Sequence, residues 1–260
     1  MSLLVWLVLL LLNSCTLGSS DDSSNVASGV RLLSESQMNK MGEQSYQSIK
    51  SKTKISSDLV MKEKIQRIGR RIAQASGKNY NWEFELFDEP KTVNAFCLPG
   101  GKIGVYTGII PIAKNEAGLA AVLGHEVAHA TLSHGNERVS QGLIASIGFA
   151  AIEAVLGDSR NRDVILGGLG IGAQFGILLP FSRNHESAAD RVGTQYMAKA
   201  GYDPREAQEL WKRMAGTGGK GPEFMSTHPD PLRRAKALEQ NLSEFLPIYQ
   251  VSEKQPSRPL

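Results

Sequence analysis

Residues that can hold a metal ion and activate water lie in the segment LGHEVAHATLSH, at positions 123–134. His125 and His129 are four residues apart, so a helix would place both imidazoles on one face, one turn apart. Zinc accepts imidazole nitrogens in this arrangement and activates water for hydrolysis. Glu126 lies beside that face and can take a proton from the attacking water. Because a buried carboxylate without a role would destabilise an apolar helix, the segment predicts a hydrolytic metal site rather than a structural helix.

A catalytic zinc site also needs a third protein ligand and an open coordination position. The segment NHESAAD, at positions 184–190, offers Glu186 as a carboxylate ligand. Asp190, one turn further on, can accept the N–H of a ligating imidazole and so fix its tautomer. The alternatives are a surface ion pair for Glu186, and a pair with Arg183 or Arg191 for Asp190.

The remaining histidines and cysteines give weaker signals. His134 and His185 are predicted to be surface residues at helix ends, where a positive charge suits the helix dipole. His228, in the segment STHPDP, has two interpretations: it belongs to the site, or it packs within a loop. Cys97 is predicted to be a small buried hydrophobic residue rather than a ligand. If Cys15 carries lipid, Cys97 has no disulfide partner in the chain.

The positions of caps, turns and apolar residues predict the elements that hold these side chains. Ser34 followed by Gln37 forms a capping box that opens the first helix. Asp203 with Pro204 opens another, and Pro99 lies in the turn of a hairpin. The pattern predicts helices over 34–50, 58–75, 115–134, 186–200, from 203 onwards and 230–242, and strands over 82–87, 93–98 and 103–109. This order indicates an α+β fold, mainly helical, with a small β-sheet next to the histidine helix.

Two long apolar stretches, 142–156 and 164–181, are ambiguous. Gln174 and several glycines favour a soluble or membrane-touching hairpin over a transmembrane pair. The net charge of +3 arises from 29 basic and 26 acidic residues. No dense basic block would follow a phosphate backbone, which argues against nucleic acid as a partner.

Four motifs in order resemble one family. HExxH and ExxxD, with NAFCLPGGKIGVYTG before them and STHPDP after them, are similar to the zinc metallopeptidases that include HtpX, the CAAX prenyl endopeptidases and exported bacterial peptidases such as BepA and LoiP. The resemblance covers about residues 34–242. It implies a gluzincin-type peptidase in which His125, His129 and Glu186 bind one zinc ion and Glu126 is the general base.

The resemblance has two further implications for the site. It implies that 93–98 is an edge strand at the cleft, against which an extended substrate pairs. It also implies that His228 approaches the metal, where it stabilises the oxyanion or occupies the fourth zinc position at rest.

The N-terminus predicts export. The apolar run Leu3–Leu12 has the length of a signal-peptide core and ends shortly before Cys15, as in bacterial lipoproteins. No Lys or Arg precedes it, so the alternatives are a start further upstream or an uncleaved anchor. Thr16 after the cysteine favours the outer membrane. The predicted organisation is a signal peptide and lipobox over 1–15, a flexible linker over 16–33, a zinc metallopeptidase domain over 34–246 and a flexible tail over 247–260.

Two functions of different classes fit these features. The first is a zinc metalloendopeptidase of the bacterial cell envelope, lipid-anchored and facing the periplasm, that cuts unfolded or misfolded proteins. The second is a chaperone-like or assembly-adaptor protein that binds polypeptides in the same cleft, its zinc site kept dormant by a histidine on the open position. Hydrolysis of a non-peptide amide is chemically allowed and has no positive support in the sequence.

Overall fold

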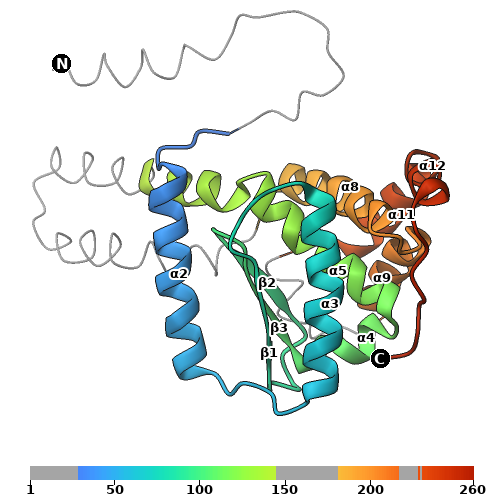
Figure 1. Cartoon of the computed structure of the whole chain (residues 1–260). Helices are drawn as coiled ribbons and strands as arrows, with labels where there is room; N and C mark the ends of the chain where they lie inside the picture. The colour runs from blue at the N-terminus through green and yellow to red at the C-terminus, as the bar shows by residue number, and fades with distance from the viewer. Residues whose placement is uncertain (1–28, 145–180, 217–227, 229) are drawn as a thin grey trace, which may run out of the picture.

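A computed structural model describes residues 29–144, 181–216, 228 and 230–260 of the chain. The predicted signal peptide, most of the linker and nearly all of the apolar stretches over 142–181 lie outside these residues. The described elements, labelled as in Figure 1, are α2 (Glu35–Lys52), α3 (Leu59–Ser76), β1 (Glu83–Phe87), β2 (Ala95–Leu98), β3 (Lys102–Tyr106), α4 (Ile110–Ala113), α5 (Glu116–Thr131), α8 (Arg183–Lys199), α9 (Arg205–Ala215), α11 (Pro231–Gln240) and α12 (Leu242–Val251). The prediction of a mainly helical α+β fold is confirmed.

The first two helices begin and end where the sequence indicates. In α2 the Gln37 backbone N–H donates to Ser34 Oγ at 3.2 Å, and the Ser34 N–H donates to Gln37 Oε1 at 2.9 Å. Asp58 caps α3, and Gly77 ends it with a φ of 69°. Such caps satisfy backbone groups that the helix itself leaves unpaired, so they fix the boundaries.

The sheet has the order β1-β3-β2, with β1 parallel and β2 antiparallel to β3. Gly100 and Gly101 connect β2 to β3 with φ of 81° and 83°, values that favour glycine. The predicted strand over 103–109 is shorter than expected, because Thr107–Ile109 forms a 3-10 turn. The hairpin leaves β2 at the edge of the sheet.

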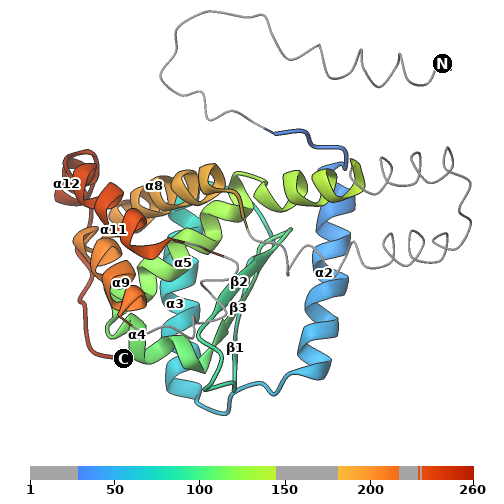
Figure 2. The same ribbon diagram turned by 180° about the vertical axis from the view of Figure 1, so that it is seen from behind.

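Helices cover both faces of this sheet (Figures 1 and 2). One face packs against α3 and α5 and forms the larger hydrophobic core, to which Ile103 and Val105 of β3 belong. The other face packs against α2 through Tyr46, which lies among Phe87, Phe96 and Leu98. The histidine helix α5 is therefore a central element of the core, and nearly all its residues are buried.

Helices α5 and α8 meet at two glycines. A Cβ on Gly193 of α8 would lie 2.6 Å from the backbone carbonyl of Gly124, and the reverse substitution meets the same obstacle. Since real Cβ atoms do not approach so closely, only glycine permits this crossing. The contact lies one residue before His125, and α9, α11 and α12 complete the packing around it.

The C-terminal region differs from its prediction. Helix α9 begins at Arg205, next to the expected start, and α11 ends at Gln240, where α12 follows. The segment after α12 is held against the start of α5: the Glu116 N–H donates to the Arg258 carbonyl at 2.9 Å and the Leu260 N–H to the Lys114 carbonyl at 3.2 Å. Figure 1 shows the C-terminus beside α4.

The last residues of the predicted linker are also held in place. The Leu32 N–H donates to Ser140 Oγ at 2.8 Å, and Arg31 forms an ion pair with Glu137 at 2.8 Å. Both partners lie on a helical stretch over 134–144 that follows α5. Among the described helices, none combines the length and the apolar character that crossing a bilayer requires.

Candidate metal centre

Helix α5 carries the first half of the site. Asn115 caps the helix, and its interior packs the core, so the backbone that holds His125, Glu126 and His129 is fixed on all sides. All three side chains are buried. The Nε2 atoms of the two histidines lie 3.0 Å apart, which confirms that the i, i+4 spacing directs both imidazoles to one point.

Glu186 and His228 complete the cluster. Glu186 Oε1 lies 3.3 Å from His129 Nε2, and Glu186 Oε2 lies 3.5 Å from His125 Nε2. His228 Nδ1 lies 2.9 Å from Glu186 Oε1 and 3.2 Å from His125 Nε2. One ligand atom from each of the four residues lies within 4.8 Å of the others. Three imidazole nitrogens and one carboxylate oxygen are a donor set that suits zinc.

Glu126 provides independent support for a reactive site. Its carboxylate is buried, and within the described part of the chain Oε1 has no hydrogen-bond partner. His228 Nε2, at 3.7 Å, is beyond hydrogen-bond distance. An unpaired buried carboxylate oxygen is unfavourable in a purely structural core. Its position beside the cluster fits a group that faces a metal ion and water.

Electrostatics favour the protonation states that metal binding requires. Burial and the neighbouring His125 hold the pKa of His129 well below its usual value, so this imidazole is neutral. Burial alone would raise the pKa of Glu186, but His228 and Arg234 lower it well below the usual range. A neutral imidazole and an ionised carboxylate are the ligand forms that bind zinc.

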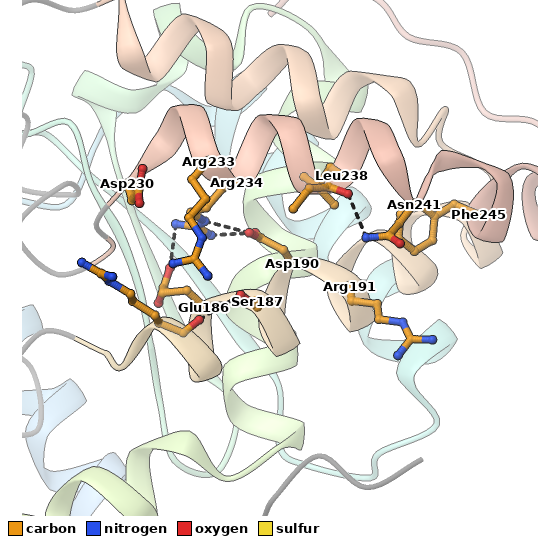
Figure 3. Close-up of a pocket in the computed structure, with 12 residues that line it drawn as sticks. Glu186, Ser187, Asp190, Arg191, Asp230, Arg233, Arg234, Leu238, Asn241 and Phe245 are labelled. Atoms are coloured by element: carbon orange, nitrogen blue, oxygen red, sulfur yellow. Dashed lines mark hydrogen bonds and ion pairs between the residues drawn. The ribbon is translucent and has the colours of Figure 1, made fainter. Parts of the chain in front are cut away.

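Asp190 lies beside the His125 nitrogen that faces away from the cluster: its Oδ1 is 3.1 Å from His125 Nδ1. Its charge partner is Arg234, not Arg183 or Arg191, since Arg234 Nε and Nη2 donate to the two carboxylate oxygens at 2.7 and 2.6 Å. Arg191 pairs with Glu244 instead. Figure 3 shows the guanidinium of Arg234 between Asp190 and Glu186.

Arg234 is a site residue that sequence reasoning missed. Its Nη1 lies 2.6 Å from Glu186 Oε2, and its guanidinium carbon lies 3.4 Å from the centroid of the Trp211 ring. Burial tends to raise the pKa of Asp190, but Arg234 more than offsets this and lowers it. The nearest sequence signal is that this arginine lies three residues after the STHPDP motif, and this signal does not reveal its partners.

The predictions for His134 and His185 as surface residues are wrong. His134 is buried, with its Nδ1 3.0 Å from His129 Nδ1. His185 is partly buried and stacks on His134, with ring centroids 4.3 Å apart, while its Nε2 lies 2.9 Å from Glu137 Oε2. Burial and the neighbouring His185 lower the pKa of His134 to about 3. Neither ring caps a solvent-exposed helix end.

A cavity of about 220 Å³ adjoins the cluster. It extends from His129 to the end of β2 at Leu98 and Pro99, and Met38 of α2 also lines it. Cys97, partly exposed, lies on the same wall and outside the four-residue cluster. Burial raises the pKa of this thiol, so it is protonated near neutral pH. The cavity thus connects the metal centre with the edge strand.

A helix with two histidine ligands and a glutamate from a second helix are the features of a zinc metallopeptidase. Comparison with known proteins agrees: the model of Peptidase family M48 matches residues 60–242, and the chain therefore belongs to this family. Members of the family use zinc, so the predictions of a metallopeptidase and of a zinc cofactor are confirmed.

Three curated relatives illustrate the similarity. The chain is 39% identical over 192 residues to the mitochondrial metalloendopeptidase OMA1 of Schizosaccharomyces pombe, covering 72% of this chain and 53% of that protein. It is 40% identical over 172 residues to the Arabidopsis thaliana protein of the same name, covering 65% and 34%. It is 28% identical over 202 residues to a putative beta-barrel assembly-enhancing protease of Vibrio cholerae, covering 74% and 41%. The chain thus spans about a third to a half of these relatives.

The predicted localisation is wrong. The N-terminus suggested an exported, lipid-anchored bacterial protein that faces the periplasm. The relatives from fungi, a plant and vertebrates are instead mitochondrial metalloendopeptidases, and the fungal and plant matches are more similar to this chain than the bacterial one is. A short apolar run before a cysteine is weak evidence, because any apolar leader or anchor contains similar residues.

Proposed function

We propose that this chain is a zinc metalloendopeptidase that cuts extended segments of polypeptides, with His125, His129 and Glu186 as metal ligands and Glu126 as general base. The observation that carries the proposal is the convergence of three ligand side chains from α5 and α8 beside a buried carboxylate whose oxygen has no hydrogen-bond partner among the described residues. Family membership supports the same reaction class.

The residues divide the chemistry between them. Zinc in such a site polarises the scissile carbonyl and lowers the pKa of water from ~15.7 towards 7. Glu126 accepts the proton of the attacking water and transfers it to the departing amine. Asp190 holds the His125 ring through Nδ1, and Arg234 holds Asp190. Each side chain is fixed before substrate binds, which lowers the reorganisation needed in the transition state.

His228 takes part in the site rather than only packing a loop. Its Nδ1 lies among the ligand atoms of His125 and Glu186, which supports a fourth-ligand role in the resting protein. Its Nε2 lies on the side of Glu126, from which it can reach an oxyanion once substrate displaces the ring. If the resting role dominates, His228→Ala will increase peptide cleavage; if the oxyanion role dominates, the same variant will decrease it.

The substrate proposal depends on β2. Among the described strands β2 lies at an edge of the sheet, with β3 on one side and no described strand on the other, and the cavity at its end leads to His129. An extended segment could pair with this open side. A folded domain cannot present an isolated strand there, so unfolded or loop segments are the expected substrates. The names of the fungal and plant relatives favour a mitochondrial location.

The test compares the wild-type chain with Glu126→Gln, measuring zinc content and cleavage of unfolded casein. We expect one zinc ion per chain in both and cleavage only by the wild type, because the substitution removes the base and no ligand. Glu239→Gln, at an exposed position of α11, is the matched control and should cleave like the wild type.

Two results would contradict the proposal. Zinc in both proteins with cleavage in neither would favour the adaptor function with a dormant site, and His228→Ala would then be the next variant. The absence of zinc from the wild type would refute the metal centre itself.

A further inference from the structure

We propose that His134 is a positioning residue for the metal ligand His129, an inference that depends on the metal centre of the proposed function. His134 accepts a hydrogen bond from His129 Nδ1–H and so directs His129 Nε2 towards the metal. The sequence gives no indication of this role, since His134 lies five residues after His129.

The two nitrogens of His129 face different neighbours. Nε2 lies 3.0 Å from His125 Nε2 and 3.3 Å from Glu186 Oε1, so it faces the ligand cluster. Nδ1 points away from the cluster and lies 3.0 Å from His134 Nδ1. A ligating Nε2 must present its lone pair to the metal, which leaves the ring proton on Nδ1. His134 Nδ1 is then the acceptor of that proton's hydrogen bond.

The backbone must bend to make this contact possible. In a continuous helix, residue 134 would point about 140° away from residue 129, because each residue turns the helix by about 100°. Ser133 interrupts the helix with a φ of 60°, and the helical stretch over 134–144 starts directly after this break. A left-handed conformation is unfavourable for a residue with a Cβ, and such residues concentrate where neighbouring contacts hold them for function.

Further contacts hold the His134 ring. His185 stacks on it with an interplanar angle of 18°, and His185 is held in turn by Glu137. The arrangement parallels the support of His125, whose Nδ1 lies 3.1 Å from Asp190. Both ligand imidazoles therefore have a partner on the nitrogen that faces away from the cluster, as metal-binding histidines usually do.

The test is a pair of nearly isosteric variants of the full chain, His134→Asn and His134→Leu. The asparagine amide oxygen occupies nearly the place of His134 Nδ1 and can accept the same hydrogen bond, whereas leucine cannot. The zinc dissociation constant is measured by competition with a chelator. We expect His134→Leu to raise it by roughly 10–100-fold, the usual effect of losing an outer partner of a ligand, and His134→Asn to remain close to the wild type.

Two outcomes would overturn the inference. One is a folded His134→Leu variant that binds zinc as tightly as the wild type. The other is an equal loss in both variants, which would assign the effect to ring packing against His185 rather than to the hydrogen bond.

Nuclear magnetic resonance of the zinc-loaded wild type keeps the inference testable if a variant does not fold. The expected signature is a slowly exchanging proton on His129 Nδ1; a metal bond through Nδ1 would overturn the proposal. Neither the zinc dissociation constant nor the proton signal depends on peptide cleavage. The role of His134 can therefore be refuted independently of the proposed peptidase function. A wild type without zinc refutes the proposed function, whereas a zinc-loaded wild type with unaffected variants refutes only the role of His134.

Discussion

The two histidines of α5, His125 and His129, are held by different kinds of neighbouring side chain. His125 is backed by charge: Asp190 of α8 faces its Nδ1, and Arg234 of α11 binds both Asp190 and Glu186. His129 is backed by a buried imidazole, His134, which belongs to the segment directly after α5. His125 is thus oriented by charged residues from distant parts of the chain, and His129 by a histidine ring that is close in the sequence.

The difference shows where each half of the site is vulnerable. The charged half is stable only while each buried charge keeps its partner, since an unpaired buried ion is far more costly than the complete pair is beneficial. The half around His129 depends less on charge and more on a backbone conformation, the positive φ of Ser133. Substitutions in the two halves should therefore affect different measured quantities.

The largest effect is expected for Arg234→Met. Methionine can replace the side-chain stem over Trp211, but it leaves the carboxylates of Asp190 and Glu186 buried without their arginine. Breaking a buried ion pair in this way typically costs about 3–5 kcal/mol of the free energy of unfolding. Chemical denaturation of the metal-free chain measures this change.

The adjacent Arg233 provides the matched control. Its side chain is exposed on the same helix, so Arg233→Met should change the free energy of unfolding by less than about 0.5 kcal/mol. Equal stability of Arg234→Met and the wild type would show that the residues around His125 do not depend on this arginine.

Asp190→Asn should have a smaller effect on stability and a clear effect on metal binding. The variant keeps the shape of the side chain and removes the charge that stabilises His125 and pairs with Arg234. We expect the zinc dissociation constant to rise by roughly 10–100-fold, as for other partners behind a ligand. Chelator competition measures it, and a value equal to that of the wild type would mean that His125 needs an acceptor but no charge.

Glu137→Gln tests the contact between Glu137 and His185, which is the furthest from His129 in its half of the site. This variant should have the smallest effect. Burial tends to raise the pKa of Glu137, but Arg31 and His185 lower it overall. A carboxylate whose folded pKa lies below its unfolded value of about 4.3 stabilises the fold above that pH. This contribution disappears as the pH falls through the folded pKa.

The expected result is therefore a loss of about 1 kcal/mol at pH 7, the typical net value of a hydrogen bond, that shrinks as the pH falls towards 3. Urea unfolding of Glu137→Gln and the wild type at several pH values measures it. A difference that stays constant over this range would show that the charge of Glu137 does not contribute.

Much of the fold could be predicted because local signals and tertiary packing agree. The capping box predicted at Ser34 is present, and α2 and α3 begin and end within two residues of the predicted ranges. Caps such as Ser34, Asp58 and Gly77 act over three or four residues, so a local pattern suffices to find such boundaries. Helix α12 was missed, since the pattern ended its last helix at 242 and predicted a flexible tail over 247–260. Its packing depends on contacts with α8, which no local pattern reveals.

The site residues also divide into those that local spacing predicts and those that only tertiary contacts bring together. The HExxH spacing brings its side chains together because helix geometry alone determines their directions. Arg234 could not be found, because its partner Asp190 lies 44 residues away in the sequence. His134 was assigned to the surface as a residue at a helix end, and the left-handed Ser133 that precedes this buried ring leaves no mark in a residue pattern.

The glycine contact between α5 and α8 has a consequence for metal selectivity. A Cβ on Gly124 or on Gly193 would lie 2.6 Å from the backbone carbonyl of the other glycine, so at this crossing no side chain separates the two helices that carry the cluster. The approach of the two helices beside His125 is therefore limited by main-chain atoms and not by a side chain. The three imidazole nitrogens and one carboxylate oxygen that the helices and His228 bring together suit a small tetrahedral ion and discriminate against calcium, which requires six to eight oxygen ligands.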